Sequence, residues 1–339
     1  MMKRISCGLV GVVLLAGSLP SLGRENGANL SPACRVVPLP GHRTAFEFKG
    51  ENVLVWHHGK QYPRPFFYPL RSPKGTVLTR MGHPGAPDHD HHRSIWFAHH
   101  KVEGVNFWGD EGENLGRIHQ KQWLAYEDGD EEALMAVLLG WEDPTDRELM
   151  EQEVVAAWRP GQLERGRSYE LELQLTFRCT GSPVELEQTN FGFLAVRMAR
   201  ELSGHFGRGQ LRDSEGRTGE KAIFGQSARW MDYSGPTAAL PEGREGVAYF
   251  AHPANPDYPS HWHVREDGWM GAGFCLKKAC LLREGQPLVL RYLLVAHSGS
   301  AGVEELSRVG KDFGGRPGFT VRKSTRPHRQ FEVFRRELK

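Results

Sequence analysis

The segment from Ser168 to Cys179, SYELELQLTFRC, alternates strictly between two kinds of side chain. Its odd positions are apolar or tyrosine, and its even positions are Ser, Glu, Glu, Gln, Thr and Arg. Successive side chains of a β-strand point to opposite faces, so the pattern predicts a strand with one buried face and one polar face. Half-buried strands of this kind are typical of antiparallel sheets.

Shorter alternating segments recur along the chain, and turn motifs separate them. The segments are TAFEFKG, NVLVWHH, RIHQKQWLAY, ALMAVLLGW, EQEVVAAW, SARWMDY, GVAYFAH and PLVLRYLLVAH, and the turns include SPKG, EDGD, RPGQ, CTGSP and REGQP. Helical spacing is clear only in GVEELSRVGKDFGG, near residues 302–315. With no internal repeat of roughly 20–50 residues, the sequence predicts an all-β protein, a large antiparallel β-sandwich with one short C-terminal helix.

The N-terminus has the pattern of a secretory signal peptide. Lys3 and Arg4 precede an apolar run over residues 5–16, and small residues precede Arg24. This run is shorter than the ~20 apolar residues of a membrane-spanning helix, although a single membrane anchor is the alternative. We therefore expect a signal peptide at 1–23, a single β-sandwich domain at 24–315, a basic C-terminal tail at 316–339, and a periplasmic or secreted protein with no membrane span in its mature chain.

The overall charge argues against nucleic acid as a partner. Lys3 and Arg4 belong to the expected signal peptide, and without them the 43 basic residues become 41, equal to the 41 acidic ones. A nucleic-acid-binding protein usually has a basic excess or stripe. The eight Lys and Arg residues of 316–339 form a local run that is typical of a solvated tail.

Motifs of several enzyme classes are missing from the chain. It contains no GxSxG, GxxxxGK[ST] or HExxH, and no GxGxxG after a strand, which disfavours serine hydrolases, P-loop enzymes, zincins and dinucleotide enzymes. Four cysteines after the signal peptide are too few for a disulfide scaffold. Cys275 and Cys280 either form a disulfide or are two buried apolar side chains, and their spacing leaves both possibilities open.

The stretch DHDHHRSIWFAHH, residues 88–100, holds five of the sixteen histidines. Pro84 and Pro87 make its approach a loop, so we expect a strand from about His91. In such a strand, positions 91, 93, 95, 97 and 99 share one face and the even positions share the other. The middle is apolar on both faces and the ends are polar, which predicts an interior strand with a site at its edge.

Three roles are open for these histidines. His91, His92 and His99 are candidate catalytic acids or bases, because an unperturbed imidazole titrates near pH ~6.5. His89 and His91, two residues apart, are instead candidate ligands of a divalent metal, with Asp88 or Asp90 in support. They can also be structural histidines that organise the loop. We expect a site without a metal or other cofactor.

The sequence also resembles a known family. YPLRSPKGTVLTR followed by DHDHHRSIWFAHHKVEGVNFW is similar to the hallmark of the bacterial PmoA-like family, labelled "methane oxygenase", and further matches occur at 190–199, 246–265 and 290–299. Ser94 stands where glycine is usual and Asp90 where proline is usual. The resemblance implies a mutarotase-like supersandwich and a secreted, mostly-β protein of unknown function that handles carbohydrates. The family label implies a metal-dependent oxygenase as a remote alternative.

Further polar and aromatic residues lie beside predicted strand ends. Glu187 is a candidate catalytic partner of the histidines, and the candidate substrate-binding residues are Arg93, Asn190, Arg197, His252, His263 and Trp96. Planar polar groups suit the hydroxyls of a sugar, aromatic faces suit its CH groups, and Arg93 and Arg197 suit a uronate carboxylate. Each has a structural alternative: Glu187 can face solvent, Arg197 can pair with a nearby acid, and Trp96 can belong to the core.

These features together predict a secreted carbohydrate-active protein. The leading hypothesis is an enzyme with histidine acid–base chemistry on a sugar or uronate, as a hydrolase, lyase or epimerase, and the sequence does not choose among these reactions. The alternative is a non-catalytic carbohydrate-binding module or a metal-stabilised structural domain. A glycosidase with paired carboxylates is a weaker hypothesis, because only Glu187 stands out as an acid.

Overall fold

A computed structural model describes residues 31–83, 85–86 and 89–336. The predicted signal peptide at 1–23 lies outside these residues and stays a prediction. Contacts between Cα atoms gather the chain from Pro32 onward into one compact unit. Neither α-helix of the described part is long and apolar enough to cross a membrane.

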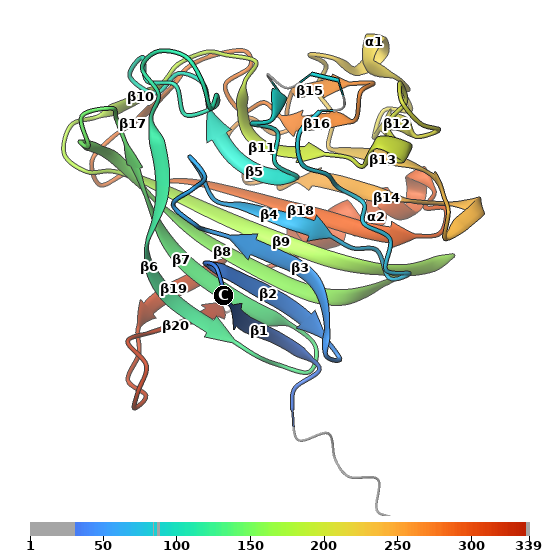
Figure 1. Cartoon of the computed structure of the whole chain (residues 1–339), viewed down its shortest axis with the longest axis horizontal. Coiled ribbons are helices and arrows are strands. Elements are labelled where there is room, and N and C mark those ends of the chain that lie inside the picture. The colour runs from blue at the N-terminus through green and yellow to red at the C-terminus, as the bar shows by residue number, and fades with distance from the viewer. Residues whose placement is uncertain (1–30, 84, 87–88, 337–339) are drawn as a thin grey trace, which may run out of the picture. The chain divides into compact units, whose positions relative to one another are not determined.

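Two eight-stranded antiparallel sheets form the body of this unit (Figure 1). The first sheet has the strand order β1 (Cys34–Leu39), β2 (Arg43–Phe48), β3 (Glu51–His57), β4 (Phe66–Leu70), β5 (Ile95–His99), β11 (Gly192–Arg197), β16 (Trp269–Ala272) and β15 (Trp262–Arg265). The second has the order β12 (Gln210–Asp213), β13 (Trp230–Thr237), β14 (Leu240–Ala251), β18 (Leu288–Ser298), β9 (Gly166–Cys179), β8 (Glu148–Leu163), β7 (Ala133–Glu142) and β6 (Arg117–Glu127). The predicted all-β antiparallel sandwich is confirmed.

Smaller elements complete the described chain. Two pairs of short strands lie outside the large sheets. They are β10 (Val184–Leu186) with β17 (Cys280–Leu282), and the hairpin of β19 (Phe319–Lys323) with β20 (Phe331–Arg335). The helices are α1 (Glu220–Ile223), α2 (Val303–Gly315) and a 3-10 turn at Arg200–Leu202. The short C-terminal helix predicted near 302–315 is α2.

The main core lies between the two large sheets. Apolar side chains from β2, β3 and β5 of the first sheet and from β7, β8 and β9 of the second form one buried cluster. In β9, Leu171, Leu173, Leu175 and Phe177 belong to it, as the alternation of the sequence predicts. Burying one apolar face of each sheet against the other is what stabilises a sandwich.

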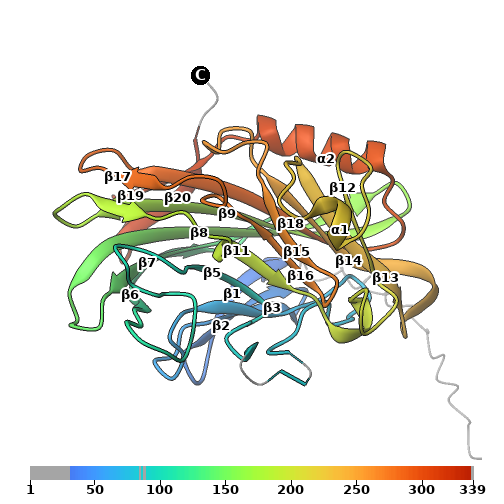
Figure 2. The same ribbon diagram turned by 90° about the horizontal axis from the view of Figure 1, so that it is seen from above.

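The outer face of the second sheet is also partly covered. Helix α2 packs Leu306 and Phe313 on Trp230, Phe250 and other residues of β13, β14 and β18 (Figure 2). The hairpin β19–β20 packs Phe319 and Val333 on small apolar residues of β6, β7 and β8. Because these elements cover it, the outer face of the sheet is not uniformly polar.

The basic C-terminal segment differs from the solvated tail that we expected. Residues 316–336 cover the polar face of β9, where Glu172, Gln174 and Thr176 are buried rather than solvated. Gln174 exchanges hydrogen bonds with the backbone of Phe319, and Arg335 donates to Glu172 at 3.0 Å. The basic residues there neutralise buried carboxylates, a role that local charge alone does not reveal.

The histidine stretch also differs from the expected strand. Strand β5 begins at Ile95, not near His91, and Ser94 before it has φ +56°. Ile95 and Phe97 face the main core, whereas Trp96 and Ala98 join an aromatic cluster on the outer face of the first sheet. A left-handed residue interrupts the two-residue period, so the odd–even division of faces does not extend from β5 back to the histidines.

Candidate functional site

A hollow of about 420 Å³ opens on the outer face of the first sheet, beside the N-terminal end of β5. Five imidazoles line it, from His89, His91, His92, His100 and His263. The hollows around Tyr258, Ala301 and Tyr62 each have fewer imidazoles in their lining. The histidine-lined hollow is therefore the candidate functional site.

The register of the first sheet builds the floor of this hollow. Trp96 pairs with Ala195 across β5 and β11, and Ala195 pairs with Gly271, which pairs with His263 on β15. Residues paired in this way share a face of the sheet. The small Ala195 and Gly271 leave room between Trp96 and His263.

A second row of paired residues runs beside the first. Arg197 on β11 pairs with Trp269 on β16, and Trp269 pairs with Arg265 on β15. All three residues line the hollow. A guanidinium, an indole and a second guanidinium therefore lie in line across three neighbouring strands.

The turn before β5 gathers three imidazoles at one wall. The ring centroids of His91 and His92 are 4.3 Å apart, those of His89 and His92 5.1 Å, and those of His89 and His91 5.7 Å. Burial lowers the pKa of His92 well below its ordinary range, and the neighbouring His91 and Arg197 lower it further. His92 is therefore neutral at physiological pH, packed between its neighbours and the rings of Trp96 and Trp269.

His263 stands on the opposite side of the floor. Its Nδ1 atom lies 2.8 Å from the carbonyl oxygen of Asn190. A carbonyl oxygen only accepts, so Nδ1 carries the proton and Nε2 keeps a free lone pair in the neutral ring. Burial lowers the pKa of His263 to about 4, so this lone pair is present at neutral pH.

Two ion pairs hold the charged side chains of the site. Arg197 donates from Nη1 to Asp267 at 2.6 Å, and His83 Nε2 lies 3.1 Å from the other oxygen of Asp267. Burial by itself would raise the pKa of Asp267, but the Arg197 guanidinium outweighs it and the pKa lies below the ordinary value. Asp267 is thus an ionised carboxylate on the wall of the hollow.

The second ion pair lies just outside the lining. Asp110 receives hydrogen bonds from both terminal nitrogens of Arg93 and from Arg64. Burial opposes ionisation, but the bonds from Arg93 and the charge of Arg64 lower the pKa of Asp110 below its ordinary value, and His91 contributes. Arg93 is therefore committed to Asp110 rather than to the hollow.

Aromatic side chains form the rim. Phe191 is 42% exposed, an unusual position for a phenylalanine, and its ring centroid lies 5.9 Å from that of Trp108 and 5.6 Å from that of His263. Exposed aromatic faces beside polar groups are suited to the CH faces of sugar rings. Trp108 and Trp269 also line the hollow.

The structure brings only some of the predicted site residues together. His91, His92, Arg197 and His263 line the hollow, as does His89. Trp96 is buried beneath it, in the cluster with Trp108 and Trp269. Asn190 contributes its backbone carbonyl to His263.

Other predicted residues lie away from the lining. His99 is fully buried on the core side, stacked on Phe193, with Nε2 2.9 Å from the carbonyl oxygen of Glu187. The Glu187 carboxylate accepts from the backbone of Gly104. His99 and Glu187 therefore do not form a catalytic pair, because the imidazole of His99 contacts the backbone carbonyl of Glu187 and not its carboxylate.

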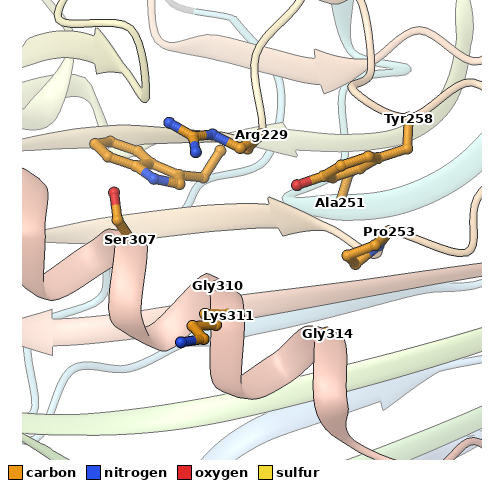
Figure 3. A pocket seen from close by; sticks show the side chains of 9 residues that line it. Arg229, Ala251, Pro253, Tyr258, Ser307, Gly310, Lys311 and Gly314 are labelled. Carbon is orange, nitrogen blue, oxygen red and sulfur yellow. The ribbon is translucent and has the colours of Figure 1, made fainter.

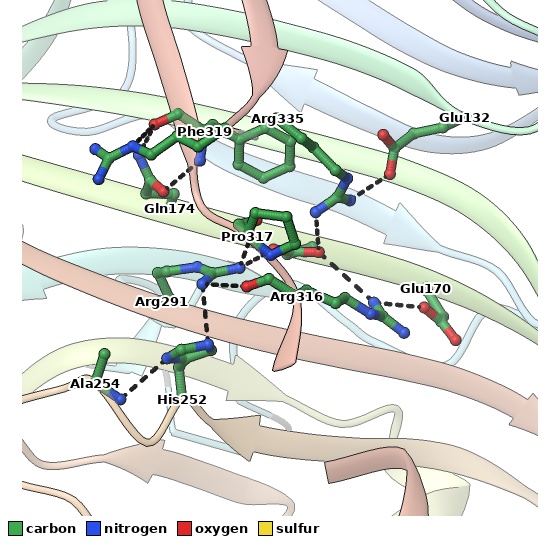
Figure 4. A network of polar contacts seen from close by, with 12 residues as sticks. Glu132, Glu170, Gln174, His252, Ala254, Arg291, Arg316, Pro317, Phe319 and Arg335 are labelled. Carbon is green, nitrogen blue, oxygen red and sulfur yellow. Dashed lines mark hydrogen bonds and ion pairs between the residues drawn. The ribbon is translucent and has the colours of Figure 1, made fainter. Parts of the chain in front are cut away.

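His252 lies in a separate network behind the second sheet (Figure 4). Its Nε2 is 2.9 Å from Nη1 of Arg291, and Arg291 in turn binds Glu172 at 2.6 Å. Burial and Arg291 lower the pKa of His252 to about 4. It supports the attachment of the C-terminal segment and takes no part in the hollow.

The sequence analysis did not propose the aromatic residues Phe191 and Trp108 of the lining, nor three residues of one hairpin. Arg265, Asp267 and Trp269 all belong to the hairpin of β15 and β16. Their signal was the alternation of His263 and Arg265 before the turn EDG, which places two polar side chains on one face of a short strand.

The structure describes the residues of the proposed metal site only in part. His89 and His91 both line the hollow, while Asp88 lies outside the described residues. Among the residues that are described, no group of three His, Cys, Asp or Glu side chains is arranged to hold a metal ion. Cys275 and Cys280 are free thiols.

A second hollow, of about 300 Å³, lies between α2 and the segment after β14 (Figure 3). Ser307, Gly310, Lys311 and Gly314 of α2 form one side, and Arg229 and Tyr258 lie opposite. No histidine or carboxylate of the described chain lines it. It therefore lacks the acid–base groups of the first hollow.

Comparison with solved structures gives distant similarities. The GH36 α-galactosidase AgaB from Geobacillus stearothermophilus matches with a TM-score of 0.36 and 13% identity, over 78% of this chain and 41% of that chain. AgaA from the same organism matches with a TM-score of 0.28 and 13% identity, over 61% of this chain and 30% of that one. This chain thus spans less than half the length of these enzymes.

Comparison with curated proteins finds no match. A family profile matches residues 43–310, and its description is "Family of unknown function (DUF6807)". The resemblance to the PmoA-like family was therefore wrong, because the family that the chain matches is a different one. The match covers most of the sequence and every strand of the two large sheets except β1, and the chain belongs to the family of unknown function DUF6807.

Proposed function

We propose that the histidine-lined hollow is the active site of an enzyme that transfers protons to and from a sugar or a similar polyhydroxylated ligand. The observation that carries this proposal is the convergence of five imidazoles, an Asp267–Arg197 ion pair and three aromatic side chains, of which Phe191 is exposed, in one hollow. Imidazoles supply proton transfer near neutral pH, and aromatic faces supply a platform for a sugar ring.

The carboxylates at the site favour histidine chemistry over a paired-carboxylate glycosidase. Such a glycosidase needs one carboxyl group with a raised pKa as its general acid. Asp267 and Asp110 are both held by arginines, and the pKa of each lies below its ordinary value. Neither is suited to give up a proton at neutral pH, so we assign proton transfer to imidazoles.

His263 is our candidate base and His91 our candidate acid. The hydrogen bond from His263 to Asn190 directs the proton to Nδ1 and leaves Nε2 as the acceptor. His91 lies on the other side of the floor, close enough to Asp110 to contribute to the lowered pKa of that carboxylate. A base and an acid from different walls of one hollow can act on two atoms of the same ligand.

The first test is turnover of a panel of neutral and acidic polysaccharides by the His263→Asn variant. An asparagine amide keeps the bond to the Asn190 carbonyl but removes Nε2, so kcat is expected to fall by about 100-fold or more while sugar binding remains. His328→Asn, on an exposed histidine outside the site, is the matched control and keeps full activity. Unchanged turnover in His263→Asn contradicts the assignment.

The pH dependence gives a second test. His263 has to be neutral to accept a proton, and with a pKa of about 4 it loses this neutral form only in acid. We expect kcat/KM of the wild-type enzyme to fall as the pH drops through about 4 and to be level above it until another group titrates. A kcat/KM that already falls as the pH drops through about 6 assigns the base to a different histidine.

A non-catalytic carbohydrate-binding module is the alternative. It predicts that sugars bind in the hollow but that no member of the panel is converted. Metal analysis of the purified protein separates a metal-stabilised domain from both, since that domain retains a stoichiometric ion and melts at a lower temperature after chelation.

We also propose that the enzyme acts outside the cytoplasm, because residues 1–23 have the pattern of a signal peptide. N-terminal sequencing of the exported protein is expected to begin at Arg24. A mature chain that begins at the first methionine contradicts export.

A further inference from the structure

The arginines around the hollow differ in how fully their nitrogens are paired. Arg93 places both terminal nitrogens on Asp110. Arg265 is half-exposed, pairs with Glu220 at 2.9 Å and packs over the ring of Phe224. Arg197 differs from both, because it is fully buried and yet only its Nη1 has an acceptor in the described chain, on Asp267.

The other two donor nitrogens of Arg197 are buried. Nε and Nη2 are closed off from solvent and have no hydrogen-bond partner among the described residues. The side chain is 0% exposed yet contributes to the lining, so it lies within the floor of the hollow. A guanidinium has donors only, and a buried donor without an acceptor is destabilising.

Arg80 is a second arginine whose guanidinium has buried donor nitrogens without a partner in the described part of the chain. Its backbone N–H donates to the carbonyl oxygen of Arg197, and its Nε and Nη2 atoms are also buried without a partner in the described structure. Burial and the charge of Arg197 lower the pKa of Arg80 to about 10, while Asp267 opposes this effect. One carboxylate, Asp267, therefore serves two guanidinium groups and His83.

An acceptor with negative charge would complete this arrangement. With Arg265 paired to Glu220, Arg197 and Arg80 share the single carboxylate of Asp267, which leaves one positive charge in excess before the imidazoles are considered. A carboxylate matches the fork of a guanidinium, and a buried charge-assisted pair is stronger than a neutral hydrogen bond.

We propose that the ligand of the hollow is an acidic sugar, whose carboxylate binds at Arg197 and is attracted by the charge of Arg80 behind it, while its ring lies against Phe191 and Trp108. This inference rests on the proposed function and deepens it by naming the substrate class. The carboxylate shares Arg197 with Asp267 and meets the otherwise unpaired donors in the floor. The imidazoles of His91 and His263 then flank the ring of the sugar.

The test compares two probes that differ only in charge. Binding of D-glucuronate and of its neutral isostere D-glucuronamide is measured by calorimetry on the full protein at low salt. We expect glucuronate to bind at least about tenfold more tightly, since the amide replaces an anionic acceptor by a group that is partly a donor. The preference is expected to shrink as salt is added, although less than for exposed charges.

Variants then test which arginines cause the preference for glucuronate over glucuronamide. Arg197→Met and Arg80→Met are each expected to reduce the ratio of the two affinities toward one, with melting curves recorded to check folding. If Arg197→Met does not fold, Arg80→Met carries the test, because Arg80 is only partly buried. Arg308→Gln, on the exposed face of α2, removes one positive charge away from the lining and keeps the wild-type ratio.

The outcomes separate this inference from the proposed function. Equal binding of glucuronate and glucuronamide overturns the acidic-sugar assignment and leaves a neutral-sugar site in place. A preference that survives in both methionine variants overturns the role of these arginines. If neither probe binds while a neutral polysaccharide is converted, the acidic-sugar assignment fails and the proposed enzymatic function remains. If nothing binds or reacts, both proposals fail.

Discussion

Ser94 is the residue that sets the position of the candidate histidines. It is fully buried with φ +56°, a conformation that costs most L-residues about 1–2 kcal/mol. Its hydroxyl donates to Thr79 Oγ1 at 2.7 Å, which helps to hold the turn. His91 lies in the turn that precedes this residue, so the neighbouring His91 and His92 both reach the hollow, which adjacent residues of a continuous strand would not.

Two substitutions separate the strain at Ser94 from its hydrogen bond. Ser94→Ala keeps the left-handed backbone and loses the bond to Thr79, so we expect a loss of about 1 kcal/mol in the free energy of unfolding. Ser94→Gly loses the same bond but relieves the backbone, so it is expected to be close to wild type. Denaturant unfolding measures both, and a glycine variant less stable than the alanine variant contradicts this account.

At the scale of elements, a buried carboxylate joins the loop after β4 to the second sheet. Glu245 on β14 accepts hydrogen bonds from Ser72 and Ser298 at 2.6 Å, from Thr76 at 2.7 Å, and from Thr237. Burial would raise its pKa, but these four hydroxyl donors together bring the pKa below the ordinary value. The loop from Ser72 to Thr76 leads through residues 79–81 toward the histidine turn, so this junction supports the site.

Glu245→Gln tests the junction. The amide is neutral and turns one acceptor into a donor facing other donors, so the free energy of unfolding is expected to fall by about 2–3 kcal/mol near pH 7. The folded pKa of Glu245 is lowered, so its contribution is present above the unfolded value of about 4.5 and is lost as the pH falls through the folded pKa. The difference between variant and wild type should therefore shrink in acid, and a constant difference rules out this linkage.

At the scale of the whole molecule, the C-terminal segment closes the outer face of the second sheet. Arg291, Arg316 and Arg335 surround the buried Glu172 and the partly buried Glu170 on β9 (Figure 4). Phe319 is fully buried on small residues of β7 and β8. The polar face of β9 is stable in the interior only because this segment supplies its partners.

Phe319→Ala measures how strongly the segment is attached. Removing this ring leaves a cavity against Val155 and Ala157, and the expected loss is about 3–5 kcal/mol in the free energy of unfolding. Val321→Ala, on the same strand but only partly buried, is the control and should cost about 1 kcal/mol or less. Similar losses in the two variants would mean that the hairpin is not cooperatively attached to the sheet.

The strands could be predicted because their cause is local. Alternation in residues 168–179 reports directly on the two faces of β9, and the helical period near 302–315 reports on α2. The site could be predicted only in part. His91 and His92 stood out by their clustering, and Arg197 and His263 by their place in strands, whereas Arg265 and Asp267 became neighbours of these histidines only through the pairing of β11, β16 and β15.

The sequence by itself determined the class of fold and the kind of chemistry available, because side-chain period and residue type are properties of the chain. The tertiary structure alone decided which polar groups meet. It placed His99 and His252 in structural roles, committed Arg93 to Asp110, and left Arg197 short of acceptors. These outcomes depend on strand order and register, which bring together residues more than 150 positions apart, and no local pattern carries that information.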